Sequence, residues 1–274
     1  MKIIKTVESK DGTKKLLLEL DDGNLIESVI IPQKNDKYTF CISTQVGCAM
    51  GCKFCATSKL GFKRNLTSDE IVEQVLSMHE IIGKKPHSIV YMGMGEPMNN
   101  LENVIKSIKK LNHPKIYNYS ERKITISTCG VIEGMELLRR KTNSFLAISL
   151  HGTDDKKRSE LMPINNKYNM KDLVGLTNFF PRNKKEKVMI EYLLLKGIND
   201  SDEDLRNLKE LFSKDNVMFN LIKYNNVKDS NLEPSGDETF QRFSEELIKA
   251  GFKTFIRDSR GDDIAAACGQ LKLG

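Results

Sequence analysis

The apolar positions near the N-terminus predict short strands. Apolar runs at residues 3–4, 14–20 and 25–31 are separated by the turn sequences DG at 11–12 and DDGN at 21–24. Such Asp-Gly and Gly-Asn turns are hairpin signals. Pro32 and the polar residues after it mark a boundary. We therefore expect a small β extension over residues 1–37.

Beyond this boundary, strand-like runs alternate with helical patterns. The clearest helix begins with Thr67 and Glu70 at capping-box spacing, continues with apolar residues at helical spacing, and meets a stop signal at Gly83. Alternating strands and helices predict a parallel sheet. Six or so such units are too few for a closed eight-stranded barrel, and a doubly wound sheet also fits the periodicity. The expected strands are 38–43, 88–92, 123–127, 145–150, 188–195 and 218–222, and the later helices are 101–111, 133–140, 170–180, 202–212 and 237–249.

Length, charge and cysteine content narrow the class of protein. The 274 residues suffice for one sizeable core, and no apolar run approaches a membrane span. The N-terminal sequence MKIIK lacks an apolar signal core, so we expect a cytoplasmic protein. Six cysteines in such a chain indicate metal-binding or catalytic residues rather than disulfides. The net charge of +6 is compatible with an RNA partner but also with an ordinary solvated surface.

Four cysteines lie within fifteen residues. Cys48, Cys52 and Cys55 form a C-x3-C-x2-C triplet with glycines at 47 and 51, and Cys41 lies seven residues upstream. Thiolates at this spacing can bind one soft metal centre. Since iron–sulfur clusters usually take four cysteines, three would leave one iron open. The alternatives are a structural zinc site, which lacks a second ligand pair here, and buried structural cysteines.

The triplet resembles the signature of the radical S-adenosylmethionine (SAM) enzymes. The flanking strings QVGC at 45–48, FCAT at 54–57 and GFKRNL at 61–66 resemble the RlmN/Cfr family of RNA adenine methyltransferases, and the resemblance extends over about residues 12 to 272. It implies an α/β fold with an open (βα)6 partial TIM-type barrel over residues 38–257 and a C-terminal tail over 258–274. It also implies a [4Fe-4S] cluster on Cys48, Cys52 and Cys55, whose open iron binds SAM.

The resemblance also implies SAM contacts at the carboxyl ends of strands, where parallel barrels carry their chemistry. GMGEP at 93–97 resembles a family motif, and NLIKYN at 220–225 resembles the family's NLIPWN-type segment, with Lys223 in place of proline. The alternative for the GMGEP segment is an ordinary turn. The alternative for His151 is a hydrogen-bonded structural histidine. The implied SAM contacts are Gly95, Glu96, Ser127, Ser149, Leu150, His151 and Asn225.

The tail sequence RGDDIAAACGQL at 260–271 closely resembles the family's RGDDIDAACGQL. The resemblance implies that Cys268 takes a methyl group from one SAM. A 5′-deoxyadenosyl radical from a second SAM then removes hydrogen from that methyl group, and the carbon adds to an adenine. Cys41 attacks the sulfur of Cys268, and the methylated base leaves behind a transient disulfide. The remaining cysteine, Cys129, is interpreted as a packed thiol.

Glu27 is our candidate for the base that removes the ring proton, because the family has a glutamate shortly before the upstream cysteine. The spacing from Glu27 to Cys41 is one residue longer here than we expect. An ordinary glutamate on a strand surface is the alternative.

The implied substrate is an unstacked adenine in rRNA or tRNA, with carbon 2 and carbon 8 both open as targets. We expect an electron donor such as flavodoxin or ferredoxin, a monomer, and no membrane partner. Typical members carry a further N-terminal helical domain, so we expect a short member without it. Basic residues placed to meet phosphates are Lys59, Lys63, Arg64, Arg257 and Arg260, and a charged helix face is the alternative for each.

Two other classes of protein remain open at this stage. One is a diverged radical SAM enzyme that acts on a small molecule or peptide, and the other is a non-enzymatic metal-binding or redox-sensing protein. Neither class needs both outlying thiols, Cys41 and Cys268. Their presence together with the triplet favours the methyltransferase.

Overall fold

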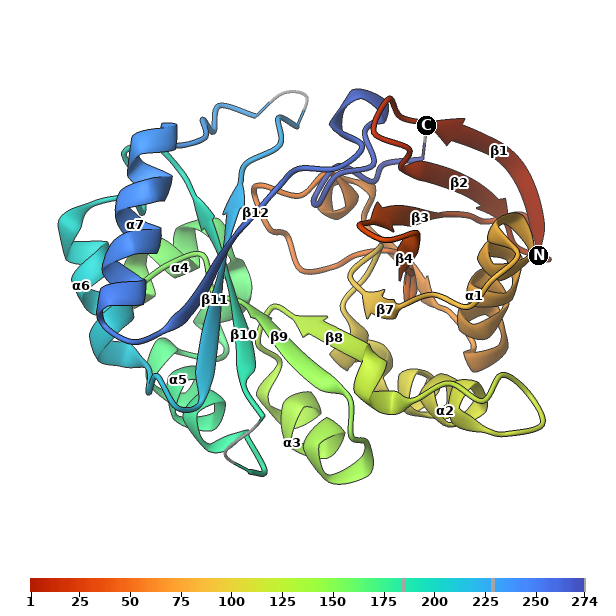
Figure 1. Cartoon of the computed structure of the whole chain (residues 1–274), viewed down its shortest axis with the longest axis horizontal. Coiled ribbons are helices and arrows are strands. Elements are labelled where there is room, and N and C mark those ends of the chain that lie inside the picture. The colour runs from red at the N-terminus through yellow and green to blue at the C-terminus, as the bar shows by residue number, and fades with distance from the viewer. Residues whose placement is uncertain (184–185, 228–229, 274) are drawn as a thin grey trace.

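The computed structural model describes residues 1–183, 186–227 and 230–273. In this part of the chain, ten strands form one sheet in the order β1-β2-β3-β4-β7-β8-β9-β10-β11-β12 (Figure 1). The short strands β5 (Gln45–Gly47) and β6 (Phe62–Asn65) form a separate antiparallel pair. An α/β fold with N-terminal antiparallel strands therefore accounts for the whole described chain.

The N-terminal strands β1 (Lys2–Glu8), β2 (Lys14–Glu19) and β3 (Leu25–Gln33) are antiparallel neighbours, as predicted. Strand β3 continues through Pro32, which is paired with Tyr38 of β4 (Lys37–Cys41). Asn35 and Asp36 form the turn between them with φ of 60° and 53°. The β extension is thus continuous with the main sheet, and the boundary expected after residue 37 lies in a hairpin.

From β4 onward all neighbouring strands are parallel, which confirms the expected open (βα)6 partial barrel. The short strands β5 and β6 were not predicted, and neither was β12 (Lys253–Arg257), which adds a seventh parallel strand. Its five residues are exposed or half-buried, so they lack the apolar run by which the other strands are recognised. The remaining parallel strands are β7 (Ser88–Tyr91), β8 (Ile124–Thr128), β9 (Phe145–Ser149), β10 (Val188–Leu194) and β11 (Val217–Lys223).

Six helices connect successive parallel strands and cover the outer face of the sheet (Figure 1). Another helix, which the sequence did not predict, is α4 in the segment between β9 and α5. In the described part of the chain no helix is long and apolar enough to cross a membrane. The helices are α1 (Ser68–Ile82), α2 (Leu101–Asn112), α3 (Ile132–Lys141), α4 (Asp155–Leu161), α5 (Met170–Phe179), α6 (Asp202–Leu211) and α7 (Asp237–Lys249). Short 3-10 turns are η1 (Ala56–Leu60), η2 (Pro97–Asn100), η3 (Glu121–Lys123), η4 (Pro163–Asn166) and η5 (Asp262–Ile264).

The ends of helix α1 follow the local sequence signals. The hydroxyl of Thr67 accepts a hydrogen bond from the amide of Glu70 at 3.2 Å, and the Glu70 carboxylate accepts from the amide of Thr67 at 2.8 Å. Gly83 ends the helix in the left-handed conformation with φ of 75°. The predicted capping box and stop signal are therefore confirmed. Along the chain, α1 follows the loop that carries the cysteine triplet (residues 48–55, the cysteine loop), then η1 and β6.

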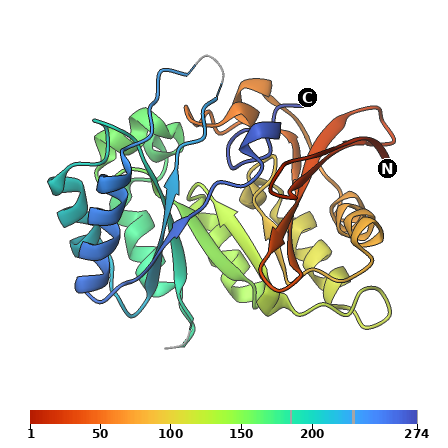
Figure 2. The same cartoon turned by 45° about the horizontal axis from the view of Figure 1, so that its top comes forward.

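The C-terminal tail returns to the N-terminal strands. After β12 the chain passes between β1–β3 on one side and the end of β11 on the other (Figure 2). Asp263 accepts a hydrogen bond from the hydroxyl of Ser9 at 2.5 Å, so residues 254 positions apart are in contact. This arrangement brings residues from both ends of the chain to the open side of the barrel.

Candidate active site

A cavity of about 540 Å³ lies inside the partial barrel. Its walls come from the cysteine loop, the inward faces and carboxyl ends of the parallel strands, and the tail. Of the site residues expected from the sequence, only Glu27 and Leu150 do not line it. Those that do are Cys41, Cys48, Cys52, Cys55, Gly95, Glu96, Ser127, Ser149, His151, Asn225 and Cys268.

The cysteine loop is shaped by one close backbone contact. Gly47 has φ of +75°, and a Cβ atom there would lie 1.8 Å from the carbonyl oxygen of Gly61. That carbonyl accepts a hydrogen bond from the amide of Cys48 at 3.0 Å. Only glycine fits this position without moving the chain, so the first cysteine of the triplet is held by backbone geometry.

The three triplet thiols could hold a metal cluster. All six cysteines are free, and Cys48, Cys52 and Cys55 line the same cavity. Ligands of a single zinc ion must lie within about 2.3 Å of one point, and no group of three His, Cys, Asp or Glu side chains among the described residues is arranged in that way. The donor set and the open space beside it fit a larger iron–sulfur group better than one ion.

Burial keeps the triplet thiols protonated while no metal is bound. Burial raises the pKa of the Cys48 thiol to about 12 and the pKa of Cys52 further, and the neighbouring thiols act in the same direction. Without a metal these groups therefore stay protonated at neutral pH. Metal ions displace such protons because the thiolate is the ligand form.

The GMGEP segment presents Glu96 in a fixed orientation. Its carboxylate accepts hydrogen bonds from the amides of Met98 at 3.0 Å and Cys129 at 2.8 Å. Burial raises the pKa of Glu96 above its ordinary value, although these amides oppose the effect. Gly95 has φ of +100°, and a Cβ atom there would lie 2.6 Å from Cβ of Gln45. The segment is thus packed tightly against the start of the cysteine loop.

His151 is a neutral hydrogen-bond donor toward the cavity. Its Nδ1 accepts from the amide of Leu193 at 3.0 Å, so the ring proton belongs on Nε2. Burial, assisted by the charge of Arg158, lowers the pKa of His151 to about 3. The ring also packs edge-on against Phe54 of the cysteine loop, with centroids 4.7 Å apart. Leu150, just before it, is fully buried in the core.

Arg158 of α4 is a structural residue that the sequence reasoning missed. Its guanidinium is fully buried and donates to the carbonyls of Leu150 at 3.2 Å and Cys129 at 2.5 Å. It also donates to Oδ1 of Asn165 at 2.9 Å. These bonds hold the ends of β8 and β9 together, and an arginine in a short helix of mostly charged residues carries no apolar periodicity that would reveal this role.

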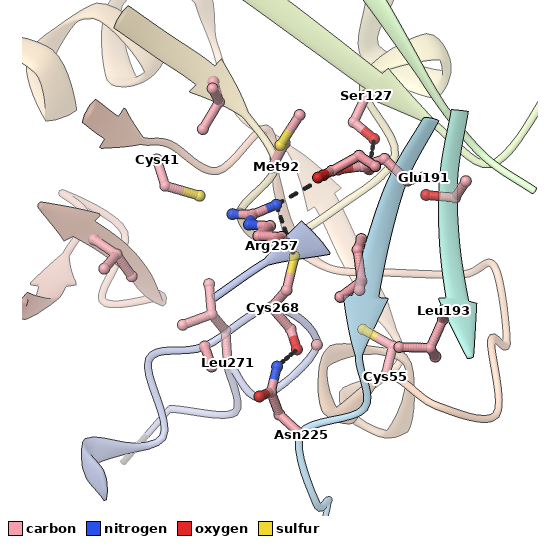
Figure 3. Close-up of a pocket in the computed structure, with 18 of the residues that line it drawn as sticks. Cys41, Cys55, Met92, Ser127, Glu191, Leu193, Asn225, Arg257, Cys268 and Leu271 are labelled. Atoms are coloured by element: carbon pink, nitrogen blue, oxygen red, sulfur yellow. Dashed lines mark hydrogen bonds and ion pairs between the residues drawn. The ribbon is translucent and has the colours of Figure 1, made fainter. Parts of the chain in front are cut away.

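A second missed residue, Glu191, lies at the centre of the cavity (Figure 3). Its carboxylate accepts from the hydroxyl of Ser127 at 3.0 Å and pairs with Nη1 of Arg257 at 3.5 Å. Glu191 is 3% exposed on β10. A charged residue inside an otherwise apolar strand was the available signal, because such a side chain must find partners when it is buried.

The two outlying cysteines lie in the same cavity. Figure 3 shows the sulfurs of Cys41 and Cys268 on either side of the Arg257 guanidinium. Nη1 of Arg257 is 4.0 Å from Sγ of Cys268, and the Asn225 side chain donates to the Cys268 carbonyl at 3.2 Å. Burial raises the pKa of the Cys41 thiol to about 12, and the pKa of Cys268 is raised as well although this residue is exposed; the charge of Arg257 opposes the shift at each thiol.

Glu27 is fully buried beneath the tail. Its Oε1 lies 3.0 Å from Nζ of Lys15, and its Oε2 accepts from the amides of Lys272 at 2.8 Å and Leu273 at 3.2 Å. The tail therefore separates Glu27 from the cavity.

These features define a radical SAM enzyme: a partial barrel with a three-cysteine loop at the end of its first parallel strand. The radical SAM superfamily pattern matches residues 42–208. A crystal structure of a radical SAM methyltransferase from Sphaerobacter thermophilus is 36% identical and superposes with a TM-score of 0.95, covering 100% of this chain and 81% of that one. The structure of TYW1 with a lysine-pyruvate adduct, at 14% identity and a TM-score of 0.57, shares the fold over 84% of this chain and 85% of that one.

Two curated relatives define the family more narrowly. The dual-specificity RNA methyltransferase RlmN of Desulfotalea psychrophila is 44% identical over 96% of this chain and 75% of the relative. The corresponding protein of Syntrophotalea carbinolica is 43% identical over 97% and 71%. The chain therefore belongs to the RlmN family of radical SAM RNA methyltransferases, which implies SAM and a [4Fe-4S] cluster as cofactors.

Proposed function

We propose that this enzyme moves a SAM-derived methyl group through Cys268 to a ring carbon, 2 or 8, of an adenine in rRNA or tRNA. One observation carries the proposal: Cys41 and Cys268 line the cavity that also contains the cysteine triplet. They are 227 residues apart in the sequence, and a cluster-binding protein without this reaction has no need of either. The relatives' printed name, dual-specificity RNA methyltransferase, supports RNA as the substrate class.

Cofactor binding is assigned to one wall of the cavity. Cys48, Cys52 and Cys55 would hold the cluster, which when bound supplies reductive cleavage of SAM. Glu96 is oriented to accept hydrogen bonds from an amine, and His151 donates from Nε2. The other proposed SAM contacts are Gly95, Ser127, Ser149, Leu150, through its main chain, and Asn225.

Cys268 accepts the methyl group as a thiolate. Its sulfur attacks the methyl carbon of SAM, a sulfur–carbon bond forms, and S-adenosylhomocysteine leaves. The Arg257 guanidinium 4.0 Å away stabilises the attacking thiolate. After the carbon has been joined to the adenine, the Cys41 thiolate attacks the sulfur of Cys268. A sulfur–sulfur bond forms as the sulfur–carbon bond breaks, the electron pair of the broken bond stays with the transferred carbon, and this carbon takes up a proton to become the methyl group of the released base.

A carboxylate is needed to remove the proton from the adenine carbon. Glu27 remains our candidate, and it can reach the cavity only after residues 272–273 leave its carboxylate. Glu191 is a second candidate because its carboxylate already lines the cavity. Glu27→Gln and Glu191→Gln separate them: the variant that lacks the base accumulates a protein–RNA crosslink, whereas the other does not.

Membership of this family supports proposals about RNA contacts, the electron donor, the localisation and the oligomeric state. Arg260 is exposed at the cavity and is free to meet a phosphate, whereas Arg64 is held by Asp22 at 2.6 Å and Glu70 at 2.8 Å. Reduction of the cluster requires a donor such as flavodoxin or ferredoxin. We propose a cytoplasmic monomer.

The test is anaerobic reconstitution with iron and sulfide, followed by SAM, a reductant, and total rRNA and tRNA. Mass spectrometry of the tail peptide should show one methyl group on Cys268, and nucleoside analysis should show methyladenosine. Cys268→Ser should lose both signals. Cys41→Ser should keep the methyl group on Cys268 and accumulate crosslinked RNA.

SAM cleavage without methylation of Cys268 would support the alternative function, a diverged radical SAM enzyme. If the wild-type protein cleaves SAM while Cys268 stays unmethylated, the methyl-carrier mechanism is wrong. The substrate would then be sought among small molecules or peptides.

A further inference from the structure

Two residues of the β extension hold the tail on both sides of Cys268. Nζ of Lys15 donates to the carbonyl of Ala265 at 3.3 Å, three residues before Cys268. Oε2 of Glu27 accepts from the amides of residues 272–273 at 2.8 and 3.2 Å, after it. Lys15 and Glu27 are themselves paired at 3.0 Å. One ion pair therefore connects the two sides of the cysteine-bearing segment.

The first turn of the β extension adds a second anchor. Asp11 accepts from the amide of Gly261 at 3.1 Å, and the hydroxyl of Ser9 donates to Asp263 at 2.5 Å. Gly261 has φ of +68°, and a Cβ atom there would lie 2.8 Å from Cγ2 of Thr13. The tail therefore packs closely against the β extension at residues 261–263, in addition to its contacts with the ion pair.

The burial of the ion pair indicates that it specifies the position of the tail and does not mainly add stability. Lys15 is 4% and Glu27 is 0% exposed. Two charges taken out of water lose so much hydration that a buried pair is often no more stabilising than packed apolar residues. A well-hydrogen-bonded buried pair does, however, specify one geometry. Here the hydrogen bonds of both side chains to the main chain of the tail specify the position of the tail.

We propose that Lys15 and Glu27 form a tail clamp, which positions Cys268 in the cavity for methylation. Lys15 is the positioning residue of the clamp, and it does not line the cavity. The inference rests on the proposed role of Cys268 as methyl acceptor. Because the clamp engages both oxygens of Glu27, opening it is also what makes this carboxylate available later in the reaction.

Lys15→Met tests the clamp because it removes the ammonium and keeps most of the side-chain volume. Two quantities are measured: amide hydrogen exchange in residues 272–273, and the ratio of Cys268 methylation to cleavage of SAM into 5′-deoxyadenosine. We expect exchange at least tenfold faster and methylation at least tenfold slower, with SAM cleavage within twofold of wild type. A general loss of structure would lower both SAM reactions together.

Lys14→Met is the matched control. Lys14 is the preceding residue on β2, and its ammonium pairs with Glu8 rather than with the tail. This variant also removes one strand lysine and one ion pair, and both measured quantities should stay at the wild-type values. Equal behaviour of Lys15→Met and Lys14→Met would overturn the clamp.

A second variant covers the case in which Lys15→Met does not fold. Lys15→Met with Glu27→Met removes both members of the buried ion pair and should show the same loss of Cys268 methylation. A base acts only after this methylation, so that role of Glu27 does not affect the readout. Methylation at the wild-type rate would refute the proposal.

Failure of the clamp and failure of the proposed function give different results. If wild-type Cys268 is never methylated, the proposed function fails, while protected amides at 272–273 in the wild type would still support the contacts. If these amides exchange in the wild type as fast as in an unstructured peptide, the clamp is absent whatever the reaction.

Discussion

Replacing Gly47 by alanine should loosen the cysteine loop by an amount that can be worked out from two contacts. The new Cβ would lie 1.8 Å from the carbonyl oxygen of Gly61, whereas ordinary contacts begin at 3.4 Å. The carbonyl must move away, and its 3.0 Å hydrogen bond from the amide of Cys48 is then lost. A lost hydrogen bond at this partly exposed site costs about 0.5–1.5 kcal/mol, and the positive φ of the alanine costs about 1–3 kcal/mol more.

Gly61→Ala is the control for this prediction. Gly61 also has a positive φ, +68°, but a Cβ atom there meets nothing within 4 Å. It should therefore lose only the conformational contribution, about 1–3 kcal/mol. The difference between the two variants isolates the contact that positions Cys48.

Urea unfolding of both variants measures the stability difference, and iron and sulfide analysis after anaerobic reconstitution measures the cluster. Gly47→Ala should be less stable than Gly61→Ala by about 0.5–1.5 kcal/mol and should bind less than half as much iron. Equal stability and equal iron content would refute the reasoning that the Gly47 contact holds the first ligand.

Three further predictions follow from buried groups. Arg158→Met should lower the free energy of unfolding by about 3 kcal/mol, because buried carbonyl oxygens lose their donor; a loss below about 1 kcal/mol in urea unfolding would contradict this. His151 has a folded-state pKa of about 3 against an ordinary 6.5, so the unfolded chain takes up the proton first. Stability should fall by about 1.4 kcal/mol per pH unit from this group as the pH drops below 6.5, and His151→Asn should remove that part of the slope in urea unfolding. The raised pKa of the Cys268 thiol predicts that its methylation rate still rises with pH between 8 and 9, because the thiolate is the nucleophile; a plateau below pH 8, measured by mass spectrometry, would contradict it.

Local sequence signals were sufficient for the framework of this protein. The capping box at Thr67, the glycine stop after α1 and the alternation of strands with helices act through residues close in sequence, and the fold bears them out. The spacing of the cysteine triplet is also a local signal, because the three cysteines lie close together in the sequence. Ligands that share one loop must converge whatever the rest of the chain does.

Elements with weak local patterns required the structure. Strand β12 has no apolar run, and α4 is a short helix with an aspartate cap inside a long connection. The β extension looked separate because Pro32 and a polar run follow it, but a hairpin joins it to the sheet. In each case long-range pairing overrides a weak local preference.

The arrangement of charges inside the cavity was decided by the tertiary structure alone. Glu191 and Arg257 form an ion pair between the two outlying thiols, and Lys15 pairs with Glu27 under the tail. The sequence by itself determined that the chain carries a cysteine triplet at the spacing expected for a cluster, two further thiols and a parallel sheet. It could not determine which buried charges meet, because each such partner lies on a different strand or segment and is brought close only by the closure of the barrel and the return of the tail.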